Sequence, residues 1–288
     1  MSDSFDLDNY LVERRTAVDT ALDDLLPVPS DPARDPGRLR EGMRYAVLLG
    51  GKRMRPLLTI AACEAAGGEI AHALPGGCAL ELIHAYSLVH DDLPAMDNDV
   101  ERRGKPTVHV EFGHGNAILI GDALLTEAFR VLARGCEGVS RANMAESVLV
   151  LGKHAGIDGM VGGQALDLAE GQSIHSLERL EDVHALKTGA LYAAAGALGA
   201  LAAQAEPARV DRLERYGLAF GIAFQHADDI LDDDQQALRE QALRRIDELT
   251  DECRTIAAEF GPRGAALTAI ADWVQARARR AAAGDRRD

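Results

Sequence analysis

The chain has few aromatic side chains and few cysteines. Aromatic residues make up only 4% of its 288 residues. The four cysteines show no CxxC spacing, so we expect neither a disulfide framework nor a cysteine zinc site, and the pattern suits a reducing compartment. The formal net charge of −15 argues against a general nucleic-acid or anionic-membrane surface, although it leaves room for a locally basic pocket.

Signals for export and membrane insertion are also missing. The N-terminal stretch MSDSFDLDNY is acidic and lacks the basic and apolar regions of a secretory signal. No uninterrupted apolar run reaches the roughly 18 residues that span a bilayer. We therefore expect a cytoplasmic, soluble protein without a membrane span.

Alanine and other apolar residues are abundant, and hydrophobic residues make up 47% of the chain. Stretches such as LYAAAGALGALAAQA (191–205) favour helix, because alanine is the best helix former and β-branched residues are sparse there. Periodicity and stop signals predict helices over 5–24, 39–50, 55–66, 77–93, 115–134, 141–155, 160–170, 177–205 (long or kinked), 207–232, 236–260 and 264–282. We find no convincing strand and no linker that would divide the chain. The prediction is an all-α bundle of ten or more helices in a single domain, residues 1–288.

The stretch ELIHAYSLVHDDLPAMDNDVERR (81–103) sets three aspartates, Asp91, Asp92 and Asp97, at the end of an apolar helix. Pro94 removes a backbone donor and ends the helix, which lets the chain bring Asp97 back toward Asp91. Carboxylates this close repel one another, so they persist at low cost only in water or around cations.

The stretch FGIAFQHADDILDDD (220–234) repeats this arrangement on a second helix. Gln225, Asp228 and Asp232 lie on one helical stripe. A single acidic cluster at a helix end is usually just exposed to water. Acids at a helix C-terminus oppose the helix dipole, however, so finding two such clusters favours a binding role over mere solvation. Oxygen ligands of this kind suit Mg²⁺ shared with phosphates, and neither stretch has an EF-hand loop. The clusters therefore suggest a diphosphate held through magnesium across a cavity.

Several basic side chains could bind such a diphosphate: Lys52, Arg53 and Arg55 beside two glycines, Arg102 and Arg103 after the first cluster, and Lys187. Guanidinium groups form bidentate hydrogen bonds with phosphate oxygens. Taken alone, each arginine is more simply a surface residue, Lys187 a side chain that reaches water along its stem, and His84 a core histidine. Their combination with the acidic clusters favours a diphosphate site.

Six segments occur in an order and spacing that resembles the trans-isoprenyl diphosphate synthases, or polyprenyl synthetases. They are LGGKRMRP, ELIHAYSLVHDDLPAMDNDVERRGKPTVH, GDALLTEAF, GMVGGQALDL, KTGAL and FQHADDILD. The bacterial farnesyl/geranylgeranyl diphosphate synthase branch is most similar, since it shares the DDxxxxD form of the first motif. The resemblance is strongest over residues 40–260. It implies the isoprenoid synthase fold, with a central active-site cavity, and a homodimer.

The resemblance also implies a reaction and a set of site residues. An allylic diphosphate ionises, C4 of isopentenyl diphosphate attacks the cation, and proton loss gives a chain five carbons longer. Two or three Mg²⁺ ions would be bound by Asp91, Asp92, Asp97, Asp228 and Asp232. The allylic diphosphate would be held by Arg102, Lys187, Thr188 and Gln225, and isopentenyl diphosphate by Lys52, Arg55, His84 and Arg103. The catalytic set would be Asp91, Asp92, Asp97, Asp228, Arg102 and Lys187.

Product length is predicted from Tyr86 and Ser87, which lie five and four residues before Asp91. In the family a bulky aromatic side chain here closes the product tunnel, which implies farnesyl diphosphate. Geranylgeranyl diphosphate is the second candidate, and Tyr86 is equally compatible with ordinary core packing.

The sequence departs from the family after Asp234, where a glycine-rich, lysine-bearing stretch usually follows. Either the chain lacks this segment or a mobile lid has been left out of the sequence, and we favour omission. A genuine absence would deprive the site of cations and a cover.

Two other functions stay open. A class I terpene cyclase shares the fold and the first acidic motif, but usually carries an Asn/Ser/Glu-type second motif. A non-catalytic partner subunit of a synthase would agree with the absent lid but not with intact acidic motifs.

Overall fold

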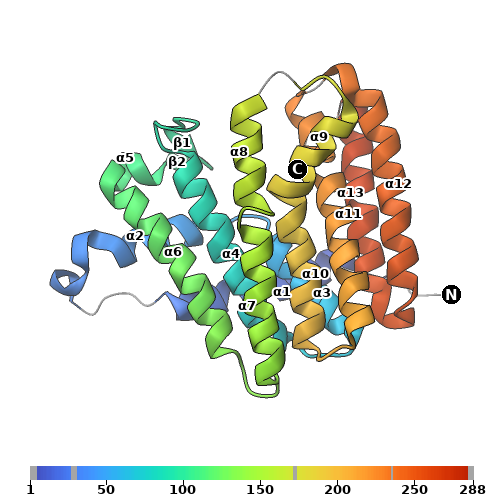
Figure 1. Cartoon of the computed structure of the whole chain (residues 1–288), viewed down its shortest axis with the longest axis horizontal. Coiled ribbons are helices and arrows are strands. Elements are labelled where there is room, and N and C mark those ends of the chain that lie inside the picture. The colour runs from blue at the N-terminus through green and yellow to red at the C-terminus, as the bar shows by residue number, and fades with distance from the viewer. Residues whose placement is uncertain (1–4, 27–30, 171–173, 235, 285–288) are drawn as a thin grey trace.

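The computed structural model describes residues 5–26, 31–170, 174–234 and 236–284. Its α-helices are α1 (Leu7–Leu25), α2 (Leu39–Leu48), α3 (Met54–Ala66), α4 (Ile70–Asp91), α5 (Val108–Phe112), α6 (His114–Arg134), α7 (Arg141–Ala155), α8 (Met160–Glu170), α9 (Leu177–His184), α10 (Ala190–Ala202), α11 (Pro207–Asp232), α12 (Arg239–Ala258) and α13 (Ala265–Ala282). Short helical turns are η1 (Pro32–Arg34), η2 (Pro36–Arg38), η4 (Ala185–Gly189), η5 (Gln236–Leu238) and η6 (Gly261–Gly264). The prediction of an all-α bundle of ten or more helices is confirmed (Figure 1).

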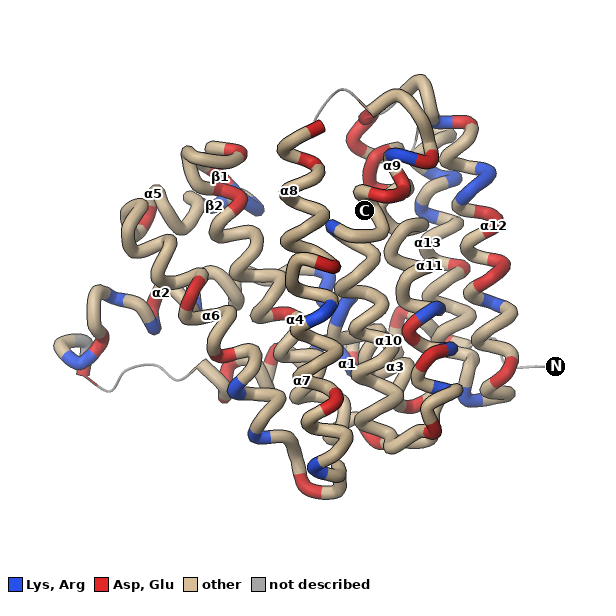
Figure 2. Tube along the Cα trace, in the orientation of Figure 1, with Lys and Arg blue, Asp and Glu red and all other residues tan. Residues whose placement is uncertain are grey.

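Helix α10 lies at the centre of the bundle. Every one of its residues is buried, and it packs against α3, α4, α7 and α11. Charged residues occur at helix ends and along outer helices such as α12, whereas α10 carries none (Figure 2). The alanine-rich sequence that predicted a helix here therefore forms the core helix of the protein.

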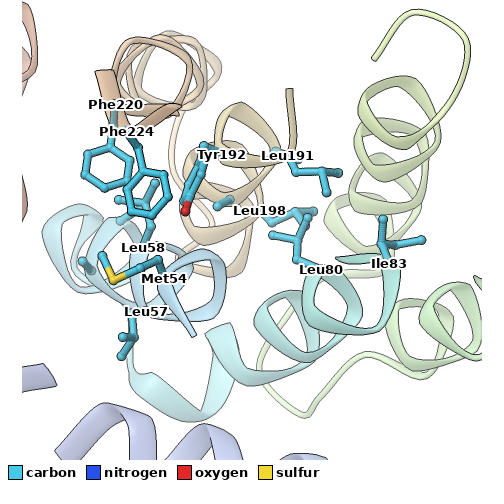
Figure 3. Close-up of a cluster of buried hydrophobic side chains, with 14 of the residues drawn as sticks. Met54, Leu57, Leu58, Leu80, Ile83, Leu191, Tyr192, Leu198, Phe220 and Phe224 are labelled. Carbon is cyan, nitrogen blue, oxygen red and sulfur yellow. The ribbon is translucent and has the colours of Figure 1, made fainter. Parts of the chain in front are cut away.

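Three of the scarce aromatic residues pack together in this core. Tyr192 of α10 packs against Phe220 and Phe224 of α11, with ring centroids 5.1 Å and 5.5 Å apart. Figure 3 shows this group beside Met54 and Leu58 of α3. Burial of such large side chains is the main source of stability for a helix pair, so this cluster fixes α3, α10 and α11 relative to one another.

One stretch, Leu177–Ala202, is long and apolar enough on average to cross a membrane, among the residues that the structure describes. Within the protein, however, 83% of its most apolar window is buried. Such burial is typical of the core helix of a folded protein.

One predicted boundary was wrong. Helix α4 begins at Ile70 and not at 77, although Pro75 lies inside it. Packing outweighs the helix-breaking tendency of proline here, because a Cβ at Gly77 would lie 3.1 Å from the Cα of Pro56, so α4 and α3 are in close contact. The long or kinked helix predicted over 177–205 is present as the uninterrupted series of α9, the π-helical turn η4 and α10, which ends at Ala202.

The expectation of no strand was also wrong in one detail. The polar loop after the first acidic cluster forms a small antiparallel hairpin of β1 (Glu101–Arg102) and β2 (Lys105–Pro106). Arg103 and Gly104 between them both have positive φ, 54° and 75°, as a two-residue hairpin turn requires. The turn fixes the positions of the two neighbouring arginines.

Candidate active site

A cavity of about 810 Å³ lies among α3, α4, α8, η4, α10 and α11. Its size is typical of a ligand-binding pocket. Most of the predicted site residues line it: Lys52, Arg55, His84, Tyr86, Ser87, Asp91, Arg103, Lys187, Thr188, Gln225 and Asp228. The remaining four, Asp92, Asp97, Arg102 and Asp232, are not in the lining.

Asp91 and Asp228, from the last turns of α4 and α11, supply the acidic part of this lining together with Glu81, which is paired with Arg53. Burial raises the pKa of Asp91 to about 6, and the nearby Asp97 carboxylate adds to the rise while Lys187 opposes it. Burial also raises the pKa of Asp228, against the effect of Arg277, whose guanidinium lies 2.6 Å from it. Both carboxylates are therefore charged at a cost that a bound cation would reduce.

The neighbouring carboxylate Asp92 points elsewhere. It is only 2% exposed and accepts hydrogen bonds from Nε and Nη2 of Arg102, the shortest at 2.6 Å. This pair ties strand β1 to the end of α4. Asp97 is exposed, and its backbone N–H donates to the carbonyl of Asp91 at 2.9 Å, which is the return of the chain that Pro94 predicted.

The second cluster divides in the same way. Asp228 lines the cavity, whereas Asp229 lies 3.1 Å from Nε2 of His184. Gln225 donates to Asp229 at 2.9 Å and accepts from the Thr188 hydroxyl at 2.8 Å. Asp229 therefore fixes the orientation of the Gln225 amide in the cavity wall, while Asp232 is exposed.

The basic part of the lining comes from the loop before α3 and from the hairpin. Arg103 donates to the carbonyl of Gly50, and Gly51 has φ +142°. A Cβ on Gly51 would lie 2.9 Å from the guanidinium of Arg103, so only glycine at this position leaves space for the arginine side chain. Arg55 lies over the ring of Tyr192, 4.8 Å from its centroid. The loop therefore presents cations to the cavity from a tightly packed backbone.

His84 lies among these cations. Burial lowers its pKa well below the ordinary value, and the positive charges of Arg55 and Arg103 lower it further. The imidazole is therefore neutral near pH 7, and it can donate a hydrogen bond to an anion without adding a charge.

Arg53 was grouped with its neighbours in the sequence, but it has a different place. It is 4% exposed and donates to Glu81 at 2.7 Å, to Asp19 at 2.9 Å and to the Val47 carbonyl at 2.8 Å. Glu81, the one acid in the interior of the apolar helix α4, was the signal in the sequence for such a partner. Arg53 therefore anchors the start of α3, and it lines the cavity beside Lys52 and Arg55 with its guanidinium already bound to protein groups.

Lys187 and Thr188 are carried by the π-helical turn η4. The Lys187 amine lies 2.6 Å from Asp167 of α8. Helix α8 reaches this turn through Gly163, where a Cβ would lie 2.2 Å from the backbone nitrogen of Lys187. π-Helical turns are frequent at functional sites, and this one sets two predicted ligands into the cavity wall.

Apolar residues that the sequence did not single out complete the lining: Met54, Leu88, Met160, Val161, Leu168, Tyr192 and Phe224. Several belong to α8, whose segment GMVGGQALDL matched the family without an assigned role. Tyr86, 7% exposed, stands in the same wall and meets His90 edge to face at 5.7 Å. Burial raises the pKa of Tyr86 to about 12, so its hydroxyl stays neutral.

No lysine comes from the connection between α11 and η5, since only Asp233, Asp234 and Gln235 separate them. Gln235 lies outside the described residues. The expectation that a lid has been left out of the sequence stays a prediction.

Comparison with known proteins shows which family the chain resembles. The polyprenyl synthetase profile matches residues 36–242. A geranylfarnesyl diphosphate synthase of Leucosceptrum canum is 45% identical over 231 residues, covering 79% of this chain and 62% of that protein. A geranylgeranyl pyrophosphate synthase of Catharanthus roseus is 44% identical over 232 residues, covering 80% and 64%. The chain thus spans less than two thirds of the length of these relatives.

Solved structures match over nearly their full length. A crystal structure of an FPP/GFPP synthase from Zymomonas mobilis has a TM-score of 0.85 at 39% identity, covering 93% of this chain and 98% of that one. A geranyltransferase from Legionella pneumophila has a TM-score of 0.83 at 34% identity, covering 94% and 97%.

Proposed function

The chain belongs to the polyprenyl synthetase family, and from this premise we propose that it is a chain-elongating trans-prenyltransferase. It condenses isopentenyl diphosphate with an allylic diphosphate, and releases diphosphate. The observation that carries the proposal is one cavity lined by Asp91 and Asp228 together with Lys52, Arg55 and Arg103. A pocket for one diphosphate would need only one such set of charges, whereas this cavity has acids for a metal-bound diphosphate and a separate basic group for a second.

The residues present fit magnesium. The Asp91 and Asp228 carboxylates in the lining have pKa values raised by burial, and oxygen-only ligands are those that Mg²⁺ prefers. We propose that Asp91, Asp97, Asp228 and Asp232 hold two or three ions, and that Asp92 joins them on release from Arg102. Bound magnesium would act as a Lewis acid on the leaving diphosphate.

The chain's own residues then have distinct tasks. Lys187, Thr188, Gln225 and Arg102 bind the allylic diphosphate and stabilise the charge that grows on it as its C–O bond breaks. Lys52, Arg55, Arg103 and neutral His84 hold isopentenyl diphosphate, so that its C4 faces the allylic carbon. The new C–C bond forms there, and a proton leaves the isopentenyl unit to restore a double bond.

The apolar lining protects this reaction from water. An allylic cation reacts with any nucleophile within reach, so the cavity must exclude water while the bond forms. Phe224, Met160 and Leu168 supply such a surface. We propose farnesyl diphosphate as the main product, because Tyr86 narrows the wall near Asp91, with geranylgeranyl diphosphate as the second candidate.

The experiment is incubation of the purified protein with Mg²⁺, isopentenyl diphosphate and dimethylallyl, geranyl or farnesyl diphosphate, followed by mass identification of products. Diphosphates extended by five carbons support the proposal. Hydrocarbons from an allylic diphosphate alone would instead identify a terpene cyclase. Products that form or change only with an added synthase would identify a partner subunit.

We further propose a single-domain, cytoplasmic homodimer. Exposed apolar side chains support a dimer: Ile118 and Leu119 on α6, Leu149 on the adjacent α7, and Ile157 just after α7. Exposed apolar surface of this kind is a candidate protein–protein interface. Sedimentation equilibrium would test it, and a monomer at micromolar concentration would contradict it.

A further inference from the structure

A second group of metal-ligand side chains lies beside the cavity but outside its lining. His184 ends α9, and His226 and Asp229 lie on α11. One nitrogen or oxygen atom from each of the three lies within 4.8 Å of the others. Neither the proposed reaction nor the diphosphate sites use these side chains.

The group is buried. The side chains of His226, His184 and Asp229 are 0%, 7% and 15% exposed. The two imidazole rings meet edge to face at 4.7 Å. Nε2 of His184 lies 3.1 Å from Asp229, and Nε2 of His226 lies 3.4 Å from Glu181, so each ring turns this nitrogen toward a neighbouring carboxylate.

We propose that His184, His226 and Asp229 bind one divalent transition-metal ion of the zinc class. Two imidazoles and a carboxylate are the donors that zinc takes in proteins, whereas magnesium takes oxygens. In a tetrahedral zinc site with bonds of about 2.1 Å, ligand atoms lie roughly 3.4 Å apart. His184 Nε2 and Asp229 Oδ2 are already 3.1 Å apart, and an atom of His226 lies within 4.8 Å of both, so it has to approach by at most about 1.4 Å (4.8 Å less 3.4 Å).

A fourth ligand is at hand on α9. Oε1 of Glu181 lies 3.4 Å from Nε2 of His226, and Arg245 donates to the same carboxylate at 3.0 Å. A site made by His184, Glu181, His226 and Asp229 would be closed to substrate, as structural zinc sites are. The ion joins α11 to the end of α9, directly before the turn η4 that carries Lys187.

The bound ion is also connected to the cavity. Asp229 accepts from Gln225, and Gln225 accepts from Thr188. Ligands of this kind are oriented by their hydrogen-bonded neighbours, and the neighbours are oriented in return. The ion therefore fixes the Gln225 and Thr188 side chains in the cavity wall.

The test is titration of the metal-free full chain with Zn²⁺ by calorimetry, and with Co²⁺ by visible absorption, in excess Mg²⁺. The excess Mg²⁺ occupies the carboxylate sites of the cavity, so the Zn²⁺ or Co²⁺ binding that remains reports the site that contains histidine. We expect one ion per chain, a higher melting temperature with Zn²⁺, and affinity at least tenfold weaker in His226→Leu. His184→Gln is the second ligand variant, in case the first does not fold. Asp228→Asn is the matched control, since it alters the cavity-facing neighbour of Asp229, and it should bind as the unmodified chain does.

Three results would overturn the proposal. One is the absence of Zn²⁺ and Co²⁺ binding in excess Mg²⁺. Another is equal affinity in the folded ligand variants and the unmodified chain. The third is loss of binding in Asp228→Asn with retention in His226→Leu, because the ion would then lie in the cavity.

Discussion

Gly163 in α8 holds the turn that carries Lys187, and Gly163→Ala tests whether that close approach matters. A Cβ at this position would lie 2.2 Å from the backbone nitrogen and 2.6 Å from the Cα of Lys187. Ordinary contact begins at 3.4 Å, so the two backbones must separate by at least 1.2 Å (3.4 Å less 2.2 Å). Neither contact atom is the end of a flexible side chain, so the shift falls on the turn itself.

A displacement of about 1 Å at a positioning group can cost roughly 10²-fold in rate, which is about 2.7 kcal/mol in activation free energy. We therefore expect kcat for chain elongation to fall about 100-fold in Gly163→Ala. KM for the allylic diphosphate should rise more than KM for isopentenyl diphosphate, because we propose that Lys187 and Thr188 bind the allylic diphosphate. Steady-state kinetics with each substrate varied in turn measures both effects, and far-ultraviolet circular dichroism checks that the helices persist.

Gly152→Ala in α7 is the matched control. A Cβ at Gly152 meets nothing within 4 Å, so this change should leave the rate unaltered and stabilise the helix by about 1 kcal/mol. A folded Gly163→Ala enzyme with a rate close to that of Gly152→Ala would refute the argument.

Further predictions concern the charged and aromatic lining. Asp91→Ala and Asp228→Ala should each lower turnover by roughly 10²-fold or more without unfolding the chain, and near-normal rates in both would refute the metal assignment. Removal of Mg²⁺ by a chelator should abolish elongation and leave the helical circular dichroism signal unchanged; continued turnover would contradict it. Tyr86→Ala should shift products toward longer chains by mass spectrometry, and an unchanged distribution would leave Tyr86 as core packing. The raised pKa of Asp91 means that the folded chain binds this proton more tightly than the unfolded chain, so the carboxylate destabilises the ligand-free fold above about pH 6 and has no such effect below pH 3.8. Asp91→Asn should therefore raise the melting temperature by roughly 2 °C above about pH 6 and by less near pH 3.8. A lower melting temperature of the variant above about pH 6 would show that the Asp91 carboxylate does not destabilise the fold.

Much of the site could be predicted because the helical period is a local property. The stripe of Gln225 and Asp228, and the break at Pro94, follow from residues a few positions apart. In the structure Gln225 and Asp228 both line the cavity, and Asp97 returns to Asp91 by a backbone hydrogen bond.

What could not be predicted depends on partners far along the chain. Adjacent residues on a helix point about 100° apart, so Asp91 and Asp92 had to differ, but nothing local says which one faces the cavity. Arg102 settles it for Asp92, as His184 does for Asp229. The start of α4 was missed for a similar reason, because its contact with Pro56 of α3 outweighs the local signal of Pro75.

The inward place of Arg53 depends on tertiary structure as well. Its partners Asp19 and Glu81 come from α1 and α4, and the sequence does not bring them together. Only the packing of three helices around the start of α3 distinguishes this arginine from its neighbours Lys52 and Arg55.

We propose that Asp91 and Asp228 hold metal ions on one diphosphate across the cavity. Crystals grown with Mn²⁺ and a non-reactive thio-analogue of an allylic diphosphate would test it most directly, through the anomalous signal of manganese. We predict manganese peaks roughly 2.1 Å from carboxylate oxygens of both Asp91 and Asp228, each also in contact with the analogue's diphosphate. Diphosphate bound in the cavity with no manganese beside either carboxylate would contradict the account.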